Sequence, residues 1–219
     1  MQPDFIFTLA VLILSIVIHE VSHGYVAEML GDPTARLAGR LTLNPLKHID
    51  PLGSVIIPGL LALSGAKILI GWAKPVPYNP YNLQPRFGVP ARALEALVAG
   101  SGPGVNILIA AIFGVLIRLQ DALPLGDSFV PLASIVVYIN ILLALFNLIP
   151  IPPLDGSKVI AALLPGRFAL SYARFTESYE RYGLIAAFGF LFLFMFFLWP
   201  VFGALIAAVF SFMTGLPPL

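Results

Sequence analysis

Cysteine is absent from this 219-residue chain, and charged residues make up only 11% of it. Without cysteine there can be no disulfide and no thiolate metal site, so a metal ion would need His, Asp or Glu as ligands. A soluble domain carries about 25% charged residues to cover its surface. The 59% of hydrophobic residues therefore predicts a membrane protein. We expect one integral membrane unit over residues 1–219, with no separate soluble domain.

Four apolar stretches are long enough to span a bilayer as helices, which takes about 20 residues each. They cover residues 5–29, 96–117, 128–154 and 182–219. Asp4 stands where a signal peptide would be positively charged, so we expect the first stretch to be retained. The last stretch is long for one upright helix, at about 1.5 Å per residue. We place its membrane part at residues 182–214, as one span or two, with a break or kink expected at Trp199-Pro200.

Basic residues are concentrated in two parts of the chain. Eleven of the twelve Lys and Arg residues lie within 31–95 and 155–181. The positive-inside rule places both parts in the cytoplasm, and Met1 and the 119–129 connector outside. Residues 51–71, which are apolar but interrupted by Pro and Gly, must then enter and leave on one face as a re-entrant hairpin. The sequence predicts an all-α polytopic bundle of about five to six membrane segments.

Two of the three histidines stand four residues apart, in the run His19-Glu20-Val21-Ser22-His23. Residues at this spacing share one face of a helix, so both imidazoles can bind one metal ion. Glu20 lies beside that face, where it can accept a proton from an attacking water. The alternative is a pair of histidines bonded to neighbouring helices. However, two His and a Glu in an apolar span are costly unless they are paired or bind metal.

A catalytic zinc site usually has three protein ligands, and Asp155 is the best candidate for the third. Asp155 could instead be the N-cap of a short helix over residues 157–164. The topology favours a ligand, because the segment 128–154 returns to the face at which the first helix carries its histidines. If residues 51–71 crossed the membrane, Asp155 would emerge on the opposite face. The charge distribution and the metal geometry therefore require the same non-crossing hairpin.

Two motifs together resemble the site-2 protease family of intramembrane zinc metalloproteases, in a compact prokaryotic form without a PDZ domain. They are His19-Glu20-x-x-His23 and Asn147-x-x-Pro150-x-Pro152-x-Leu154-Asp155-Gly156. The resemblance covers a catalytic core at about residues 5–164, with three helices at its centre. It implies that His19, His23 and Asp155 bind one Zn²⁺ per chain. It also implies that Glu20 is the catalytic base and that Asn147 orients substrate or stabilises the oxyanion.

The resemblance further implies a substrate and a location. The substrate would be a transmembrane or signal-peptide-like protein, and the enzyme would lie in a prokaryotic cell membrane with its active site toward the cytoplasm. A non-proteolytic zinc-binding membrane scaffold or transporter is the alternative, and Glu20 discriminates because a binding site needs no base. Transporters usually show repeated halves, which this sequence lacks. A net charge of +1 gives no reason to expect nucleic acid.

Several polar residues have two readings. Asn147 could bond backbone groups freed by the nearby prolines. Gly102 and Asn106, which match a Gly-rich middle span of the family, are explained as well by close helix packing. His48 stands alone in a loop and is expected to be structural.

Residues 71–78 also have two readings. They could form an edge strand that pairs with the substrate. They could instead anchor the chain at the membrane surface through Trp72 and Tyr78.

Overall fold

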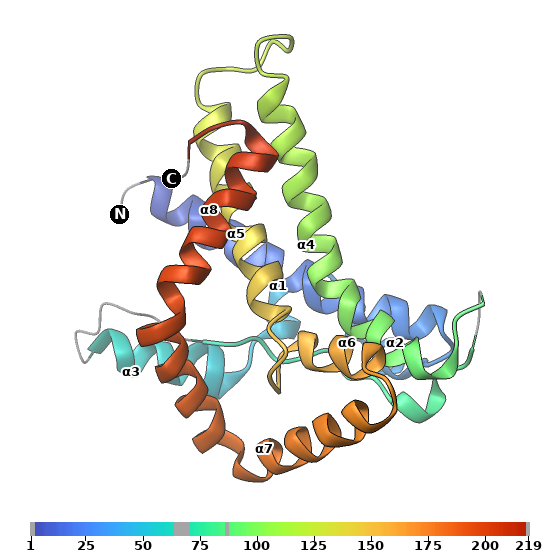
Figure 1. The fold of residues 1–219 in the computed structure, drawn as a ribbon. Coiled ribbons are helices and arrows are strands. Elements are labelled where there is room, and N and C mark those ends of the chain that lie inside the picture. Colours follow the sequence, from blue (N-terminus) through green and yellow to red (C-terminus); the bar gives the residue numbers. More distant parts are fainter. Residues whose placement is uncertain (1–2, 64–70, 86–87, 218–219) are drawn as a thin grey trace.

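The computed structural model describes residues 3–63, 71–85 and 88–217, and all regular elements in these ranges are helices (Figure 1). Four helical segments in them are long and apolar enough to span a membrane. They are Phe5–Met29, Leu94–Arg118, Phe129–Asn147 and Gly189–Thr214. The predicted polytopic all-α fold is thus confirmed, and a shorter apolar segment, formed by a π-helix (Pro51–Ile56) and α3 (Ile57–Leu63), adds to these four.

Three of the long helices form the main bundle, and they are α4 (Leu94–Arg118), α5 (Phe129–Asn147) and α8 (Trp199–Thr214). The first helix, α1 (Pro3–Met29), runs obliquely to α4 and α5 and packs against both (Figure 1). The bundle core is built from side chains of α4, α5, α8 and the turn before α8. Its buried members are Ala110, Ile117, Ala133, Val137, Ile141, Phe194, Phe202, Ile206 and Phe210.

The C-terminal segment bends at Gly183, where φ is 49° and ψ is −121°. A positive φ of this kind favours glycine, which has no Cβ. The first part of α7 (Gly166–Leu193) crosses the base of the bundle, and the chain then turns toward α8 (Figure 1). At Trp199-Pro200, where a break or kink was expected, the helix changes type. A π-helical turn, Phe194–Leu198, ends there, and Pro200 stands in the first turn of α8, where its missing N–H is tolerated.

Arg118 is the basic residue that lies outside the two basic parts of the sequence, and it stands at the end of α4. Its guanidinium donates to the carbonyls of Met213 (2.9 Å) and Phe212 (2.5 Å) in the last turn of α8. Helix C-termini leave such carbonyls without a helical partner. Arg118 therefore caps α8 and fixes the end of α8 beside the α4–α5 connector.

The two ends of the expected hairpin lie side by side. The backbone N–H of Trp72 donates to the carbonyl of Gly53 (3.2 Å), and the hydroxyl of Ser54 donates to the carbonyl of Trp72 (2.8 Å). Residues 64–70 lie outside the described residues. The chain thus leaves and returns at one place, as the hairpin requires. His48 is buried beside these ends and bonds the carbonyl of Thr42 (2.9 Å), which agrees with a structural role.

Asp32, just after α1, ties the loops around the hairpin together. Its buried carboxylate accepts hydrogen bonds from Thr34, Asn82 and the backbone N–H of Asn79. Burial alone would raise the pKa of this carboxyl, but the hydrogen bonds outweigh it and lower the pKa below its ordinary value.

The Asp32→Asn variant is expected to lower the free energy of unfolding by about 1–3 kcal/mol at neutral pH, because an amide cannot accept all of these bonds. A carboxylate with a lowered folded pKa stabilises the protein above its unfolded pKa of about 4, and this contribution is lost as the pH falls through the folded pKa. The difference between parent and variant should therefore shrink in acid. Thermal unfolding in detergent at several pH values measures it, and a difference independent of pH would contradict this account.

Candidate metal centre

Two histidines and an aspartate meet at the cytoplasmic end predicted for α1. The Nε2 atom of His19 lies 3.1 Å from Oδ2 of Asp155, and Nε2 of His23 lies 3.3 Å from the same oxygen. One ligand atom from each of the three residues lies within 4.8 Å of the others. Both histidine side chains are buried, and Asp155 is partly buried. The structure therefore brings together the three residues that the sequence predicted as metal ligands.

The other ring nitrogen of each histidine has a partner that fixes its role. Nδ1 of His23 lies 2.7 Å from the backbone carbonyl of Val98. Nδ1 of His19 lies 2.6 Å from Oδ1 of Asn106. Because a carbonyl oxygen can only accept, both Nδ1 atoms carry the proton, and in a neutral imidazole Nε2 then has a free lone pair.

These lone pairs provide a test of whether the residues fit a metal ion. The two imidazole lone pairs face the same carboxylate oxygen at 3.1 and 3.3 Å, an arrangement that is repulsive unless a proton or cation lies between them. Ligand atoms about 2.0–2.1 Å from a tetrahedral zinc ion are about 3.3 Å apart. The donor set and its spacing fit Zn²⁺.

Asp155 is the first residue of α6 (Asp155–Leu163), and the N-cap residue is Leu154. The alternative reading of Asp155 as an N-cap is therefore wrong, because its carboxylate turns to the histidines. Burial alone would raise the pKa of Asp155, but when His19 and His23 are protonated their hydrogen bonds outweigh it and lower the pKa to about 2. A bound cation would take the place of those protons. The first turn of a helix also favours a negative charge. Asp155 is thus ionised at neutral pH, as a metal ligand must be.

Two glycines let the backbone approach this cluster. A Cβ atom on Gly102 of α4 would lie 2.5 Å from Nε2 of His23 and 2.6 Å from Nε2 of His19. A Cβ on Gly156 would collide with the carbonyl of Leu148, where the chain folds back from α5 into α6. Gly102 therefore faces the metal centre directly, and helix packing alone does not explain it. Gly156 allows the turn that presents Asp155.

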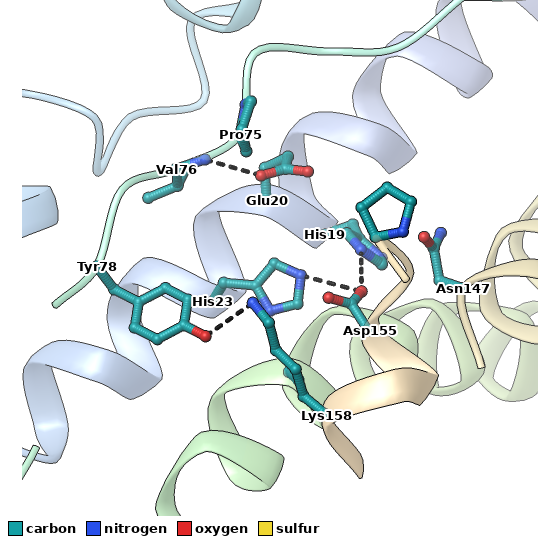
Figure 2. Close-up of a pocket in the computed structure, with 11 residues that line it drawn as sticks. His19, Glu20, His23, Pro75, Val76, Tyr78, Asn147, Asp155 and Lys158 are labelled. Carbon is teal, nitrogen blue, oxygen red and sulfur yellow. Dashed lines mark hydrogen bonds and ion pairs between the residues drawn. The ribbon is translucent and has the colours of Figure 1, made fainter. Parts of the chain in front are cut away.

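A cavity of about 160 Å³ opens beside the cluster and is lined by the three candidate ligands, Glu20, Asn147, Tyr78 and Lys158 (Figure 2). The carboxylate of Glu20 projects from α1 and accepts a hydrogen bond from the backbone N–H of Val76 (2.9 Å). Asn147 lines the opposite wall, and its amide N–H donates to the carbonyl of Leu143 one turn back (3.0 Å). The nearby prolines do not remove the backbone partner of the Leu143 carbonyl. This bond is therefore not the one expected if Asn147 served to satisfy backbone groups next to the prolines.

Residues 71–79 are all described by the structure and form no strand, and three of them, Pro75, Val76 and Tyr78, line the cavity. The backbone N–H groups of Trp72, Lys74, Val76 and Asn79 are already bonded to this protein's own acceptors. Pro75 and Pro77 have no N–H to offer. An added substrate strand would thus find few free donors here, which weakens the edge-strand reading.

No pattern in the sequence indicated that Tyr78 and Lys158 contact each other. The ammonium of Lys158 donates to the hydroxyl of Tyr78 (2.8 Å) across the mouth of the cavity (Figure 2). Tyr78 thus lines the site and is not only a surface anchor. Lys158 lies one turn after Asp155, and this spacing within a short helix was the signal that could have placed it at the site.

A polytopic helical membrane protein with a His₂Asp centre and an adjacent Glu belongs to the class of membrane metalloproteins. The pattern of Peptidase family M50 matches residues 117–196. YwhC of Bacillus subtilis, named as a zinc metalloprotease, is 38% identical over 207 residues, which are 88% of this chain and 84% of YwhC. The chain belongs to peptidase family M50, the site-2 proteases, and is a zinc metalloprotease of that type.

Two further relatives carry the name Rip2 and are also named as zinc metalloproteases. The protein of Mycolicibacterium smegmatis is 31% identical over 69% of this chain and 55% of its own length. The protein of Mycobacterium tuberculosis is 30% identical over 74% of this chain and 57% of its own length. The chain thus spans little more than half of either Rip2 protein. No solved structure matches the chain significantly.

Proposed function

We propose that His19, His23 and Asp155 hold one zinc ion per chain, and that Glu20 is the general base for hydrolysis of a peptide bond in a membrane-embedded protein. The observation that carries the proposal is the convergence of two imidazole lone pairs and one carboxylate oxygen, at 3.1 and 3.3 Å, on the wall of a cavity. Zinc, when bound, supplies Lewis-acid chemistry that polarises a carbonyl and acidifies water.

Glu20 is the cavity group that we assign to proton transfer. It follows His19 directly in α1, and its carboxylate reaches the cavity wall beside the proposed ligands (Figure 2). As a base it takes the proton of the attacking water and returns it to the leaving amine. The N–H of Val76 holds the carboxylate at this wall. That bond restricts the rotamers of Glu20 before substrate arrives.

Asn147 is proposed to bind the substrate carbonyl from the opposite wall. Its side chain lines the same cavity, and an amide can stabilise negative charge on the carbonyl oxygen. The substrate is proposed to be a transmembrane or signal-peptide-like segment, since the cavity belongs to a chain with four helices long and apolar enough to span a membrane. The unit responsible is the whole of residues 1–219, with its catalytic core at about 5–164.

Metal removal tests the proposal. Protein purified in lipid nanodiscs should contain about one zinc per chain by elemental analysis and should cleave a reporter protein with a single apolar span. Treatment with 1,10-phenanthroline should abolish cleavage, and added Zn²⁺ should restore it. The His23→Ala variant should retain no zinc. Undiminished cleavage by the metal-free protein would reject the proposed centre.

We also propose that the metal centre faces the cytoplasm of a prokaryotic cell. The described residues of the two basic parts of the sequence lie at the end of the bundle that carries α2 (Thr34–Leu37), α6 and α7, opposite the α4–α5 connector (Figure 1). Since the chain has no cysteine, single cysteines report orientation cleanly. In intact cells an impermeant maleimide should label the Asp127→Cys variant and not the Arg174→Cys variant. The reverse pattern would overturn the orientation.

A further inference from the structure

The imidazole of His19 is the end of a chain of buried polar side chains that leads away from the cavity into the bundle. Oδ1 of Asn106 (α4) bonds Nδ1 of His19, and Nδ2 of Asn106 donates to Oδ1 of Asn140 (α5) at 2.8 Å. Nδ2 of Asn140 donates in turn to the hydroxyl of Ser15 on α1 at 3.0 Å. The chain of bonds thus starts and ends on α1 and passes through the two helices that pack against it.

All three supporting residues lie among apolar side chains. Asn106 and Asn140 are 0% exposed and Ser15 is 4% exposed. Each lies in a segment apolar enough to span a membrane. Polar groups in such surroundings are costly unless every one is bonded. Here two asparagines and a serine satisfy one another's hydrogen bonds beside a proposed metal ligand. Their presence therefore needs an explanation.

The direction of the chain of bonds is fixed by a backbone carbonyl. Nδ2 of Asn140 also faces the carbonyl of Val136 at 2.9 Å, and a carbonyl can only accept. The amide nitrogen of Asn140 must therefore point there, and its oxygen must point to Asn106. Asn106 must in turn present its nitrogen to Asn140 and its oxygen to His19. Nδ1 of His19 is then the donor, and Nε2 keeps its lone pair.

The two histidines differ in how they are oriented. His23 is held by the carbonyl of Val98, which is part of helix α4 and cannot reverse. His19 is held by a side-chain amide, which would offer a donor instead of an acceptor if it turned over. The amide of Asn106 therefore needs a second group that determines whether its oxygen or its nitrogen faces His19.

We propose that Asn140 and Ser15 are positioning residues of the metal centre. They hold the amide of Asn106 in one direction, so that His19 always presents the unprotonated Nε2 to the ion. This inference rests on the proposed metal site. It adds that the affinity of the site depends on residues that do not touch it.

The Asn140→Leu variant tests this. Leucine has a similar size but removes the acceptor at 2.8 Å from the amide of Asn106. Only the long bond of 3.4 Å to the backbone carbonyl of Ser15 then remains, so Asn106 can turn over more easily. Zinc affinity, measured by competition with a chromophoric chelator, should fall about 10- to 100-fold, the usual effect of losing a group that supports a metal ligand. The visible spectrum of the Co²⁺-loaded protein should change with it, and the Ser15→Ala variant should show a smaller shift in the same direction.

A second substitution separates positioning from folding. In the double variant Asn106→Asp with Asn140→Leu, either carboxylate oxygen can accept from Nδ1 of His19, so direction no longer matters. Zinc affinity should recover toward that of the parent. A merely structural role predicts the opposite, because a charge is added to an already weakened core. Ser134→Ala removes another buried hydroxyl of α5 that is not part of the chain of bonds, and is the matched control.

The outcomes are distinct. Weakened zinc binding in Asn140→Leu, recovery in the double variant and parent affinity in Ser134→Ala support the proposal. Parent affinity in Asn140→Leu, or a loss that the double variant does not recover, overturns it while leaving the metal centre intact. Absence of zinc binding by the parent itself overturns the metal centre and this inference together.

Discussion

The Gly102→Ala variant is expected to lose its zinc and to cleave a reporter span at below about 1% of the parent rate. The added methyl group would lie 2.5 and 2.6 Å from the two Nε2 atoms that are proposed to bind the ion. Neither imidazole can withdraw without breaking its bond to Val98 or Asn106. A displacement of about 1 Å in a catalytic group already costs about 100-fold in rate.

Gly104 provides the matched control for this experiment. It lies two residues further along α4, and a Cβ at that position would meet nothing within 4 Å. The Gly104→Ala variant should keep both zinc and activity, since alanine is also a better helix former than glycine. Elemental analysis and the cleavage assay measure both variants. Full zinc occupancy in Gly102→Ala would show that the ion does not lie between these histidines.

The Glu20→Gln variant is expected to bind zinc as the parent does and to cleave about 10²- to 10⁴-fold more slowly, the usual contribution of a general base. Glutamine keeps an oxygen that can accept from the N–H of Val76, so the cavity wall should be preserved. It cannot take a proton from water.

This variant also distinguishes a protease from a zinc-binding scaffold. Zinc content by elemental analysis separates loss of the base from loss of the metal, and the Ser22→Ala variant, on the same helix, is the control for general damage to α1. Cleavage at the parent rate in Glu20→Gln would refute the role of Glu20 as base and leave catalysis to another group.

The cluster of the three proposed metal ligands could be predicted because its signals are local or topological. Helical spacing alone identifies His19 and His23 as a candidate pair of ligands. Asp155 is more than a hundred residues away, and only the balance of charge on the connectors places it at the same face. The structure brings all three together, and the bonds of Trp72 to Gly53 and Ser54 support the non-crossing hairpin on which that placement depended.

The supporting residues could not be predicted, because no local pattern shows which helix faces meet. Asn140 and Ser15 look like isolated polar residues in apolar spans until α1, α4 and α5 are packed together. Gly102 had two readings for the same reason. The bond between Glu20 and Val76 joins residues 56 positions apart through an irregular loop, for which no periodicity exists.

The C-terminal segment has a bend at Gly183 that the sequence did not reveal, in addition to the change of helix type at Trp199-Pro200. Proline is the obvious helix breaker in a sequence, yet Pro200 stands in the first turn of α8, where no helical partner for its nitrogen is needed. Gly183 is less conspicuous but adopts a positive φ that most residues avoid.

The metal centre closes a very long stretch of chain in a protein that has no covalent cross-link. His19 and Asp155 are 136 positions apart, and an ion bound by both would hold α1 and α6 together. Ligand binding adds about 2.7 kcal/mol of stability when the free ligand exceeds its dissociation constant 100-fold. Binding of the metal would therefore stabilise the packing of the helices as well as activate the enzyme. A newly inserted chain would become rigid at this end when it became active.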